Sequence, residues 1–159
     1  MFVIYVGDSR NVYKRIITNH YNGNVEASAL RRYIAEAMGF NVRRQRRSSG
    51  SVRVRIDLPD PHYGENEVSD YVLHGMWKIL LLDDYGFAHD FQWYLIEDLK
   101  PLLNRDCKQY NPNNFEEYND LMQQLTDSPF ITYSALDQNY SGPGIYVLYH
   151  QRKPLSSVG

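Results

Sequence analysis

Phe2-Val3-Ile4-Tyr5-Val6-Gly7, at the start of the chain, and Gly144-Ile145-Tyr146-Val147-Leu148-Tyr149, near its end, decide the fold. Both stretches are rich in β-branched and aromatic residues and are bounded by glycine, which is typical of buried strands. We therefore expect both stretches to form strands.

The segments between these two strands predict a mixed architecture. Apolar periodicity and capping residues favour helices over 12–20, 26–38, 67–75, 90–103 and 115–125. Further strands are expected over 51–56 and 77–82. The predicted fold class is α/β (α+β), with a small mixed or antiparallel sheet flanked by helices. At 159 residues the chain fits a single domain.

Composition excludes several classes of protein. A single cysteine, Cys107, excludes an internal disulfide and a zinc site built from cysteines, so we expect a reducing, cytoplasmic compartment. The longest apolar run, residues 79–82, is far shorter than the ~20 residues that a membrane span requires. No charged leader precedes the first strand. We therefore expect neither a membrane protein nor a secreted one.

The net charge of −2 hides an asymmetry along the chain. Residues 1–55 contain 11 of the 17 Lys and Arg residues and only three of the 19 carboxylates, which gives +8. Residues 56–159 contain the other six against 16 carboxylates, which gives −10. A basic half on a nearly neutral chain indicates a face that binds a polyanion such as nucleic acid. Two solvated surfaces of opposite sign are the alternative.

Residues suited to phosphodiester cleavage stand near the ends of the predicted elements. Tyr5 closes the first strand, Arg15 lies on the next helix, and Tyr146 opens the last strand. Cleavage needs a base near the attacking water, a cation at the charge that develops on phosphorus, and a metal ion near the leaving oxygen. A tyrosine serves as the base only if positive charge lowers its pKa, and an arginine can supply that charge. Each residue alone also fits a plain core or surface role.

Together these residues resemble the GIY-YIG nuclease family. Gly144-Ile145-Tyr146 matches the family's first signature literally, and Tyr5-Val6-Gly7 is similar to the second. Arg15 stands at the family's usual distance of ten residues after that tyrosine, and residues 100–104 resemble the family's terminal proline and asparagine segment. The resemblance covers residues 1–40, 77–104 and 130–154. It implies a GIY-YIG-like fold and a metal-dependent DNA endonuclease.

The resemblance also implies roles for single residues. Tyr5 would be the base or the phenol that activates water, assisted by Tyr146 and His20. Arg15 would stabilise the pentavalent phosphorus, and Asn104 would brace the site. The family's histidine commonly stands four residues after the arginine, whereas His20 stands five residues after it. A helix-terminal histidine favoured by the helix dipole is the alternative for His20.

The family's metal-binding glutamate is replaced. Counting back twelve residues from Asn104, to its expected place, gives Gln92. An amide is a neutral, poor ligand for Mg²⁺, which prefers carboxylate and water oxygens. Glu97 is the weaker candidate ligand, because five helical positions turn it about 140° away from Gln92. Three accounts stay open: metal binding is rearranged around Gln92, a glutamate was replaced to trap an inactive complex, or the protein binds without cutting.

The order of the signature strands also departs from the family, in which the first strand precedes the second. Joining the end of the last strand to the start of the first restores the family's β-hairpin, with residues 152–154 as its turn, so the resemblance implies that these two strands pair. This suggests a circular permutation, with residues 105–129 as the linker and residues 130–154 as the permuted first-strand region. A hairpin completed by a second chain is one alternative. A chance similarity of residues 142–146 to an ordinary turn and strand is another.

We interpret residues 41–76 as an arginine-rich insertion within one domain that spans residues 1–159. Strict alternation over 51–56 predicts an amphipathic strand whose valines point inward and whose arginines point outward. The earlier arginines then lie on a loop or a partner strand. We expect nucleic-acid contacts from Arg31, Arg32, Arg43, Arg44, Arg46, Arg47, Arg53 and Arg55. A solvated hairpin is the alternative.

The leading functional hypothesis is a Mg²⁺-dependent endonuclease of restriction or defence type that cleaves double-stranded DNA. A homodimer would allow such an enzyme to cut both strands. The rival hypothesis, from another class, is a non-catalytic module that binds nucleic acid on the same scaffold.

Overall fold

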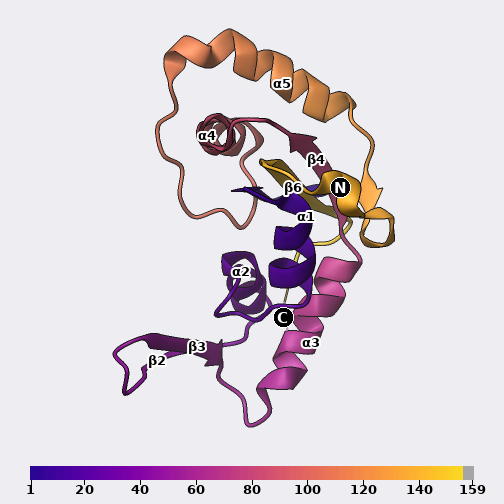
Figure 1. Ribbon diagram of the computed structural model, residues 1–159. Coiled ribbons are helices and arrows are strands. Elements are labelled where there is room, and N and C mark those ends of the chain that lie inside the picture. The colour runs from indigo at the N-terminus through magenta and orange to yellow at the C-terminus, as the bar shows by residue number, and fades with distance from the viewer. Residues whose placement is uncertain (156–159) are drawn as a thin grey trace. The chain divides into compact units, whose positions relative to one another are not determined.

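The structure, a computed structural model, describes residues 1–155 and divides the chain into two compact units (Figure 1). The sheet unit comprises Met1–Arg15 and Gly75–Arg152. The arginine unit comprises Ile16–His74 and, of the described residues after Arg152, residues 153–155. Antiparallel sheets flanked by helices confirm the predicted fold class. Among the described residues, no helix is both long enough and apolar enough to cross a membrane.

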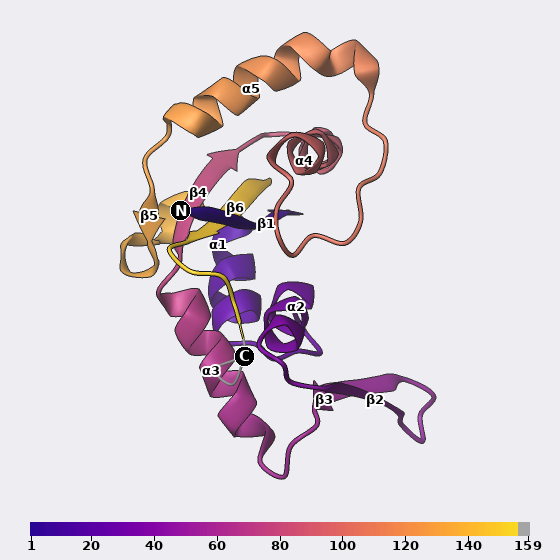
Figure 2. The same ribbon diagram turned by 180° about the vertical axis from the view of Figure 1, so that it is seen from behind.

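The sheet unit is built on four antiparallel strands. Their order is β1 (Phe2–Ser9), β6 (Gly144–His150), β4 (Met76–Leu81) and β5 (Ile131–Thr132) (Figure 2). Strands β1 and β6 pair from Phe2 opposite His150 to Ser9 opposite Gly144. This confirms that the two signature strands lie side by side, with the end of β6 beside the start of β1. The permutation inferred from that pairing stays a prediction.

Helix α4 (Tyr85–Leu99) is longer at its start than the sequence predicts. The Asp84 side chain accepts a hydrogen bond from the backbone N–H of Phe87, which caps the first turn. The helix ends at Lys100, whose φ of 50° is left-handed, and Pro101 follows outside it. The predicted range of 90–103 is therefore wrong at both ends, and Asp90 lies within the helix rather than at its start.

Helix α5 (Phe115–Asp127) agrees closely with its prediction. It packs with α4 and the sheet around a buried aromatic and aliphatic cluster that includes Phe91, Leu95, Tyr118, Ile145 and Val147. Rings of Phe91 and Tyr118 stack with centroids 5.3 Å apart, a separation typical of favourable aromatic pairs. Short 3₁₀ helices η2 (Pro112–Asn114), η3 (Tyr133–Ala135) and η4 (Gln138–Tyr140) lie in the connections.

The arginine unit contains helices α2 (Ala29–Ala37) and α3 (Pro61–Leu73). Ser28 caps α2, and Asp60 caps α3 with Pro61 in the first turn, so α3 begins before the predicted residue 67. The helix predicted over 12–20 forms as α1 (Val12–Lys14) followed by a π-helical turn, η1 (Arg15–Tyr21). The boundary between the two units falls after Arg15.

The arginine-rich segment forms a two-stranded antiparallel hairpin of β2 (Val42–Arg46) and β3 (Val52–Ile56). This confirms the predicted strand and the partner-strand option for the earlier arginines. Val52, which the alternation places inward, is 48% exposed, and only Ile56 of β3 is fully buried. A two-stranded ribbon has no second layer to cover its far end, so its alternation is buried only where β3 meets the body of the unit.

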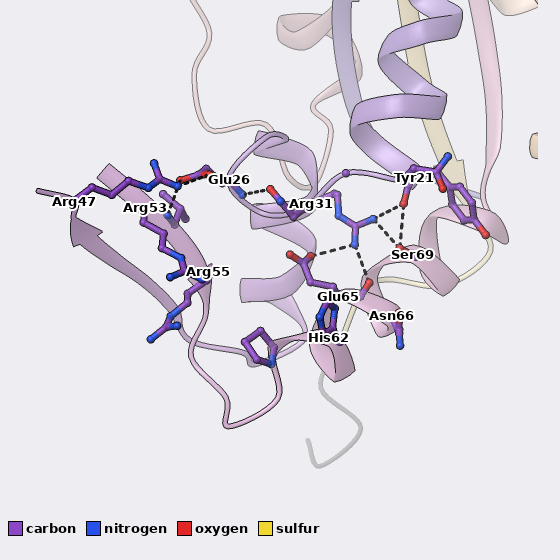
Figure 3. A pocket seen from close by; sticks show the side chains of 15 residues that line it. Tyr21, Glu26, Arg31, Arg47, Arg53, Arg55, His62, Glu65, Asn66 and Ser69 are labelled. Carbon is purple, nitrogen blue, oxygen red and sulfur yellow. Dashed lines mark hydrogen bonds and ion pairs between the residues drawn. The ribbon is translucent and has the colours of Figure 1, made fainter. Parts of the chain in front are cut away.

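The sequence predicts that Arg31 contacts nucleic acid. In the structure its side chain points into the arginine unit instead. Its side chain is fully buried and donates to the backbone oxygens of His20 and Tyr21, to Ser69 Oγ and to Glu65 (Figure 3). Burial lowers the pKa of Arg31, while Glu65 opposes that shift. Arg31 therefore ties η1, α2 and α3 together as a structural residue.

Replacing Arg31 with methionine is expected to lower the free energy of unfolding by about 3 kcal/mol, because Glu65 and two carbonyls lose a buried partner. Arg32→Met is the matched control, since Arg32 donates to one carbonyl, that of Val25. Its loss is expected to stay near 1 kcal/mol. Urea unfolding of the three proteins measures the difference, and equal losses would show that the Arg31 network is not structural.

Candidate active site

The sheet unit brings Tyr5, Tyr146 and Arg15 together. Tyr5 lies on β1 and Tyr146 on β6, and their ring centroids are 6.4 Å apart. Arg15 follows α1 and donates a hydrogen bond to the Tyr146 hydroxyl. Pairing of β1 with β6 produces this convergence, because it places residues from opposite ends of the sequence on neighbouring strands.

Burial controls the chemistry of Tyr146, whose exposed fraction is 1%. Burial raises the pKa of Tyr146 well above its usual range, and the charge of Tyr5 adds to that shift while Arg15 opposes it. The phenol therefore stays protonated at neutral pH. In that form Tyr146 is a hydrogen-bond donor and not a base.

Gly7 is required by the packing of Tyr146. It lies opposite Tyr146 in the strand pairing, and a Cβ at this position would overlap the Tyr146 ring and hydroxyl. Only glycine allows the buried phenol to lie across β1 at this point. The glycine of the Tyr5-Val6-Gly7 signature thus makes room for the tyrosine of the other signature.

Gly7→Ala is expected to destabilise the protein by about 1–3 kcal/mol, since the buried ring must move. Gly142→Ala is the matched control, because a Cβ there meets no atom within 4 Å. Thermal unfolding compares the two variants, and near-ultraviolet circular dichroism reports on the tyrosine environment. A Gly7→Ala protein as stable as Gly142→Ala would contradict the close packing.

A carboxylate and an imidazole that sequence reasoning missed lie in the same unit. Asp8 Oδ2 and His89 Nδ1 are 2.7 Å apart, and Gln92 Nε2 lies 2.9 Å from the same ring nitrogen. A carboxylate only accepts hydrogen bonds, so His89 Nδ1 donates to Asp8, and the Gln92 amide nitrogen, which is also a donor, lies beside that N–H without a hydrogen bond to it. His89 is half exposed, whereas Asp8 and Gln92 are largely buried. The spacing of three between His89 and Gln92 on α4 was the only sequence signal for this group.

A third tyrosine belongs to this group. Tyr85, the first residue of α4, donates a hydrogen bond to Asp8, and the Arg10 guanidinium carbon lies 4.3 Å from the centre of its ring. Burial raises the pKa of Tyr85, and the charge of Asp8 adds to the shift, while Arg10 and Arg15 oppose it. Asp8 is therefore held by donors from two turns of α4.

Asn104 braces β1 beside the tyrosines. Its Oδ1 accepts from the Val6 N–H at 2.8 Å, and its Nδ2 donates to the Val6 carbonyl at 3.0 Å. The backbone N–H groups of Leu102 and Leu103 donate to β1 at Val3 and Ile4. The segment after α4 therefore runs along the edge of β1 and fixes the strand that carries Tyr5.

His20 and Glu97 are not part of this group in the sheet unit. His20 belongs to the arginine unit, where it is fully buried with Nδ1 2.7 Å from Ser28 Oγ. Glu97 is exposed on α4 and hydrogen-bonds Tyr110, which raises the pKa of that tyrosine to about 12. Both residues have local partners that account for their positions.

The donor set around Gln92 limits what cation the site can hold. Among residues 1–155, no three His, Cys, Asp or Glu side chains are grouped so that they could hold a metal ion. Asp8 is the carboxylate that lies, like Gln92, beside His89 Nδ1. Such a set fits a cation that keeps most of its waters and takes one carboxylate, as Mg²⁺ does when substrate phosphates complete its shell.

The predicted nucleic-acid contacts divide into two groups. Arg31 and Arg32 are held by hydrogen bonds within the arginine unit, and Arg47 forms a 2.9 Å ion pair with Glu26. The remaining arginines lie on the hairpin, and their side chains make no hydrogen bond or ion pair with a described residue: Arg43, Arg44, Arg46, Arg53 and Arg55.

Comparison with known proteins identifies the family of the chain. A family model for the GIY-YIG catalytic domain matches residues 1–126, which include Tyr5, Arg15, Gln92 and Asn104 and end before β6. No curated protein and no solved structure matches the chain. The matched range is most of the 159 residues, and the chain belongs to the GIY-YIG catalytic domain family.

Proposed function

We propose that this protein is a divalent-cation-dependent endonuclease that hydrolyses phosphodiester bonds in double-stranded DNA, of restriction or defence type. A GIY-YIG domain is in general a nuclease domain that acts on DNA. The observation that carries the proposal is the meeting of Tyr5, Tyr146 and Arg15 in the sheet unit. These residues are the base, donor and cation that a phosphoryl transfer needs.

In this proposal Arg15 binds the non-bridging oxygens of the scissile phosphate and stabilises the charge that develops there. Tyr5, in its phenolate form, accepts a proton from the attacking water while the oxygen of that water forms a bond to phosphorus. The bond between phosphorus and the leaving oxygen breaks, and that oxygen takes a proton from solvent. Tyr146 keeps its proton and accepts the hydrogen bond of Arg15, which holds the guanidinium group in the site.

Asp8 and Gln92 are the residues that would hold a divalent cation. When bound, the cation would stabilise negative charge on the leaving oxygen. Asp8 would supply the charged ligand and Gln92 its amide oxygen, which is a weaker donor. His89 keeps the Asp8 carboxylate in place through Nδ1.

The test is to incubate the full chain with supercoiled plasmid and Mg²⁺ or Mn²⁺, with chelator as the control. Nicked or linear plasmid is expected only with the cation. Linear product that forms without prior nicked circles would support a homodimer that cuts both strands. A protein that binds DNA but cuts with neither cation would contradict the proposal and favour the non-catalytic module.

A further inference from the structure

The arginine unit contains an open pocket of about 980 Å³ between the hairpin and the start of α3 (Figure 3). The hairpin contributes Arg47, Arg53 and Arg55 to its lining, and α3 contributes His62, Glu65 and Asn66. All of these residues belong to one compact unit. The pocket is therefore a feature of the arginine unit alone.

Two of the four arginines in the pocket are already neutralised. Arg31 pairs with Glu65 at 3.1 Å, and Arg47 pairs with Glu26 at 2.9 Å. The pKa of Glu26 is lowered mainly by its hydrogen bonds from Arg47 and from the Val54 N–H, with a smaller contribution from the charge of Arg53. Both pocket carboxylates are thus committed to structural pairs.

The positive charge that remains belongs to Arg53 and Arg55. Neither side chain makes a hydrogen bond or ion pair with a described residue. The side chains of His62 and Asn66 on the α3 wall likewise have no such partner among residues 1–155. The pocket therefore offers two guanidinium groups, an imidazole and an amide to a ligand.

Strand register divides the hairpin arginines into two faces. Arg43 lies directly opposite Arg55, and Gln45 lies opposite Arg53. Directly opposed residues share a face, so Arg43, Arg53 and Arg55 form one surface, which we name the pocket face. Arg44 and Arg46 alternate onto the other surface with the valines of β3, and we name this the reverse face.

The pocket face carries an unfavourable pair. Like charges directly opposite each other on two strands destabilise the pairing, and no described carboxylate pairs with Arg43 or Arg55. Alternate residues on a strand lie roughly 7 Å apart, so Arg53 and Arg55 can bind two separate anionic groups. A ligand with regularly repeated charge matches this spacing better than a single small anion.

We propose that the pocket face binds two neighbouring phosphates of a nucleic-acid strand through Arg53 and Arg55, with Arg43 at its edge. The reverse face does not take part in binding. The inference rests on the proposed action on DNA and specifies where the phosphates lie. Guanidinium groups bind phosphate oxygens in bidentate fashion, so each arginine supplies a charge-assisted contact.

The experiment compares two double variants of the full chain with equal change in charge: Arg53→Gln with Arg55→Gln, and Arg44→Gln with Arg46→Gln. Binding to a labelled duplex is measured in chelator, so that cleavage does not enter, over a series of salt concentrations. The pocket-face variant is expected to bind the duplex at least about tenfold more weakly than the natural chain. The slope of its log affinity against log salt concentration should become shallower by the equivalent of about two phosphate contacts. The reverse-face variant should bind within about threefold of the natural chain.

Equal weakening by both variants would overturn the proposal, because the hairpin would then act as a uniform cationic surface. Failure of the natural chain to bind the duplex would overturn it as well. Displacement of the duplex by a millimolar deoxynucleoside monophosphate, acting through Arg53 and Arg55, would show a site for single phosphates instead of a strand. Circular dichroism confirms that each variant is folded.

Plasmid cleavage, assayed separately, distinguishes this inference from the proposed function. A chain that binds through the pocket face without cutting would keep the inference and contradict the endonuclease. If both double variants cut plasmid equally well and bind the duplex with equal affinity, the proposed endonuclease activity stands and the proposed binding by the pocket face is overturned.

Discussion

Arg15→Ala is expected to lower the rate of DNA cleavage at saturating enzyme by about 10²–10³-fold. Arg15 is the cation that donates a hydrogen bond to Tyr146 in the candidate site. Loss of its charge leaves the developing charge on phosphorus without a partner. Single-turnover cleavage measures the effect without interference from product release.

Lys14→Ala is the matched control for Arg15→Ala. Lys14 precedes Arg15 directly, is exposed, and carries the same charge. Its removal is expected to leave the rate unchanged. Arg15→Lys should recover part of the activity, because it restores the charge without the bidentate geometry. Cleavage by Arg15→Ala at the rate of Lys14→Ala would remove Arg15 from the site.

Gln92→Glu is expected to raise cleavage at least about tenfold at limiting Mg²⁺, because it adds a carboxylate ligand beside Asp8. Without the cation, the added charge lies near Asp8 on a largely buried helix position and should lower stability. Addition of Mn²⁺ should therefore raise the melting temperature of Gln92→Glu more than that of the natural chain. Both the rate and the melting temperature are measured over a cation titration.

Gln124→Glu is the control for this gain, since it makes the same change at an exposed position of α5. It should alter neither the rate nor the response to Mn²⁺. A Gln92→Glu protein that gains neither activity nor cation-dependent stability would show that position 92 does not face the cation.

Strands and glycine signatures were predictable because their physical causes are local. Phe2–Ser9 and Gly144–His150 are β-branched and aromatic runs that end at turns, and both formed as strands. Alternation over 51–56 likewise predicted β3. The pairing of β1 with β6 was predicted from the resemblance to the GIY-YIG family. Periodicity alone does not predict a contact between such distant segments.

Helix starts were less predictable because residues such as Asp and Pro occur both in turns and at the first positions of helices. Asp60-Pro61 follows the predicted strand over 51–56 and also fits a turn, but in the structure Asp60 caps α3 and Pro61 opens it. Asp84 similarly caps α4, whose first turn contains the aromatic Tyr85 and Phe87 rather than an evident apolar stripe. The surrounding fold determines whether such a residue forms a turn or begins a helix.

The candidate site shows the same division. Tyr5, Arg15 and Tyr146 could be predicted as candidates because they match family signatures, and Asn104 because it closes the same pattern; the structure places the first three in contact. Asp8 and His89 carry no such mark and lie 81 positions apart in sequence, so only the packing of α4 against β1 reveals their contact. Burial of Arg31 also depends on long-range partners, Glu65 and Ser69.

The most direct test of the account is a crystal structure of the full chain bound to a DNA duplex, with Ca²⁺ present to slow cleavage. The account predicts one phosphate within hydrogen-bonding distance of both the Arg15 guanidinium and the Tyr5 hydroxyl, with Asp8 on the side of the leaving oxygen. A duplex bound with every phosphate away from Arg15 and Tyr5 would contradict it.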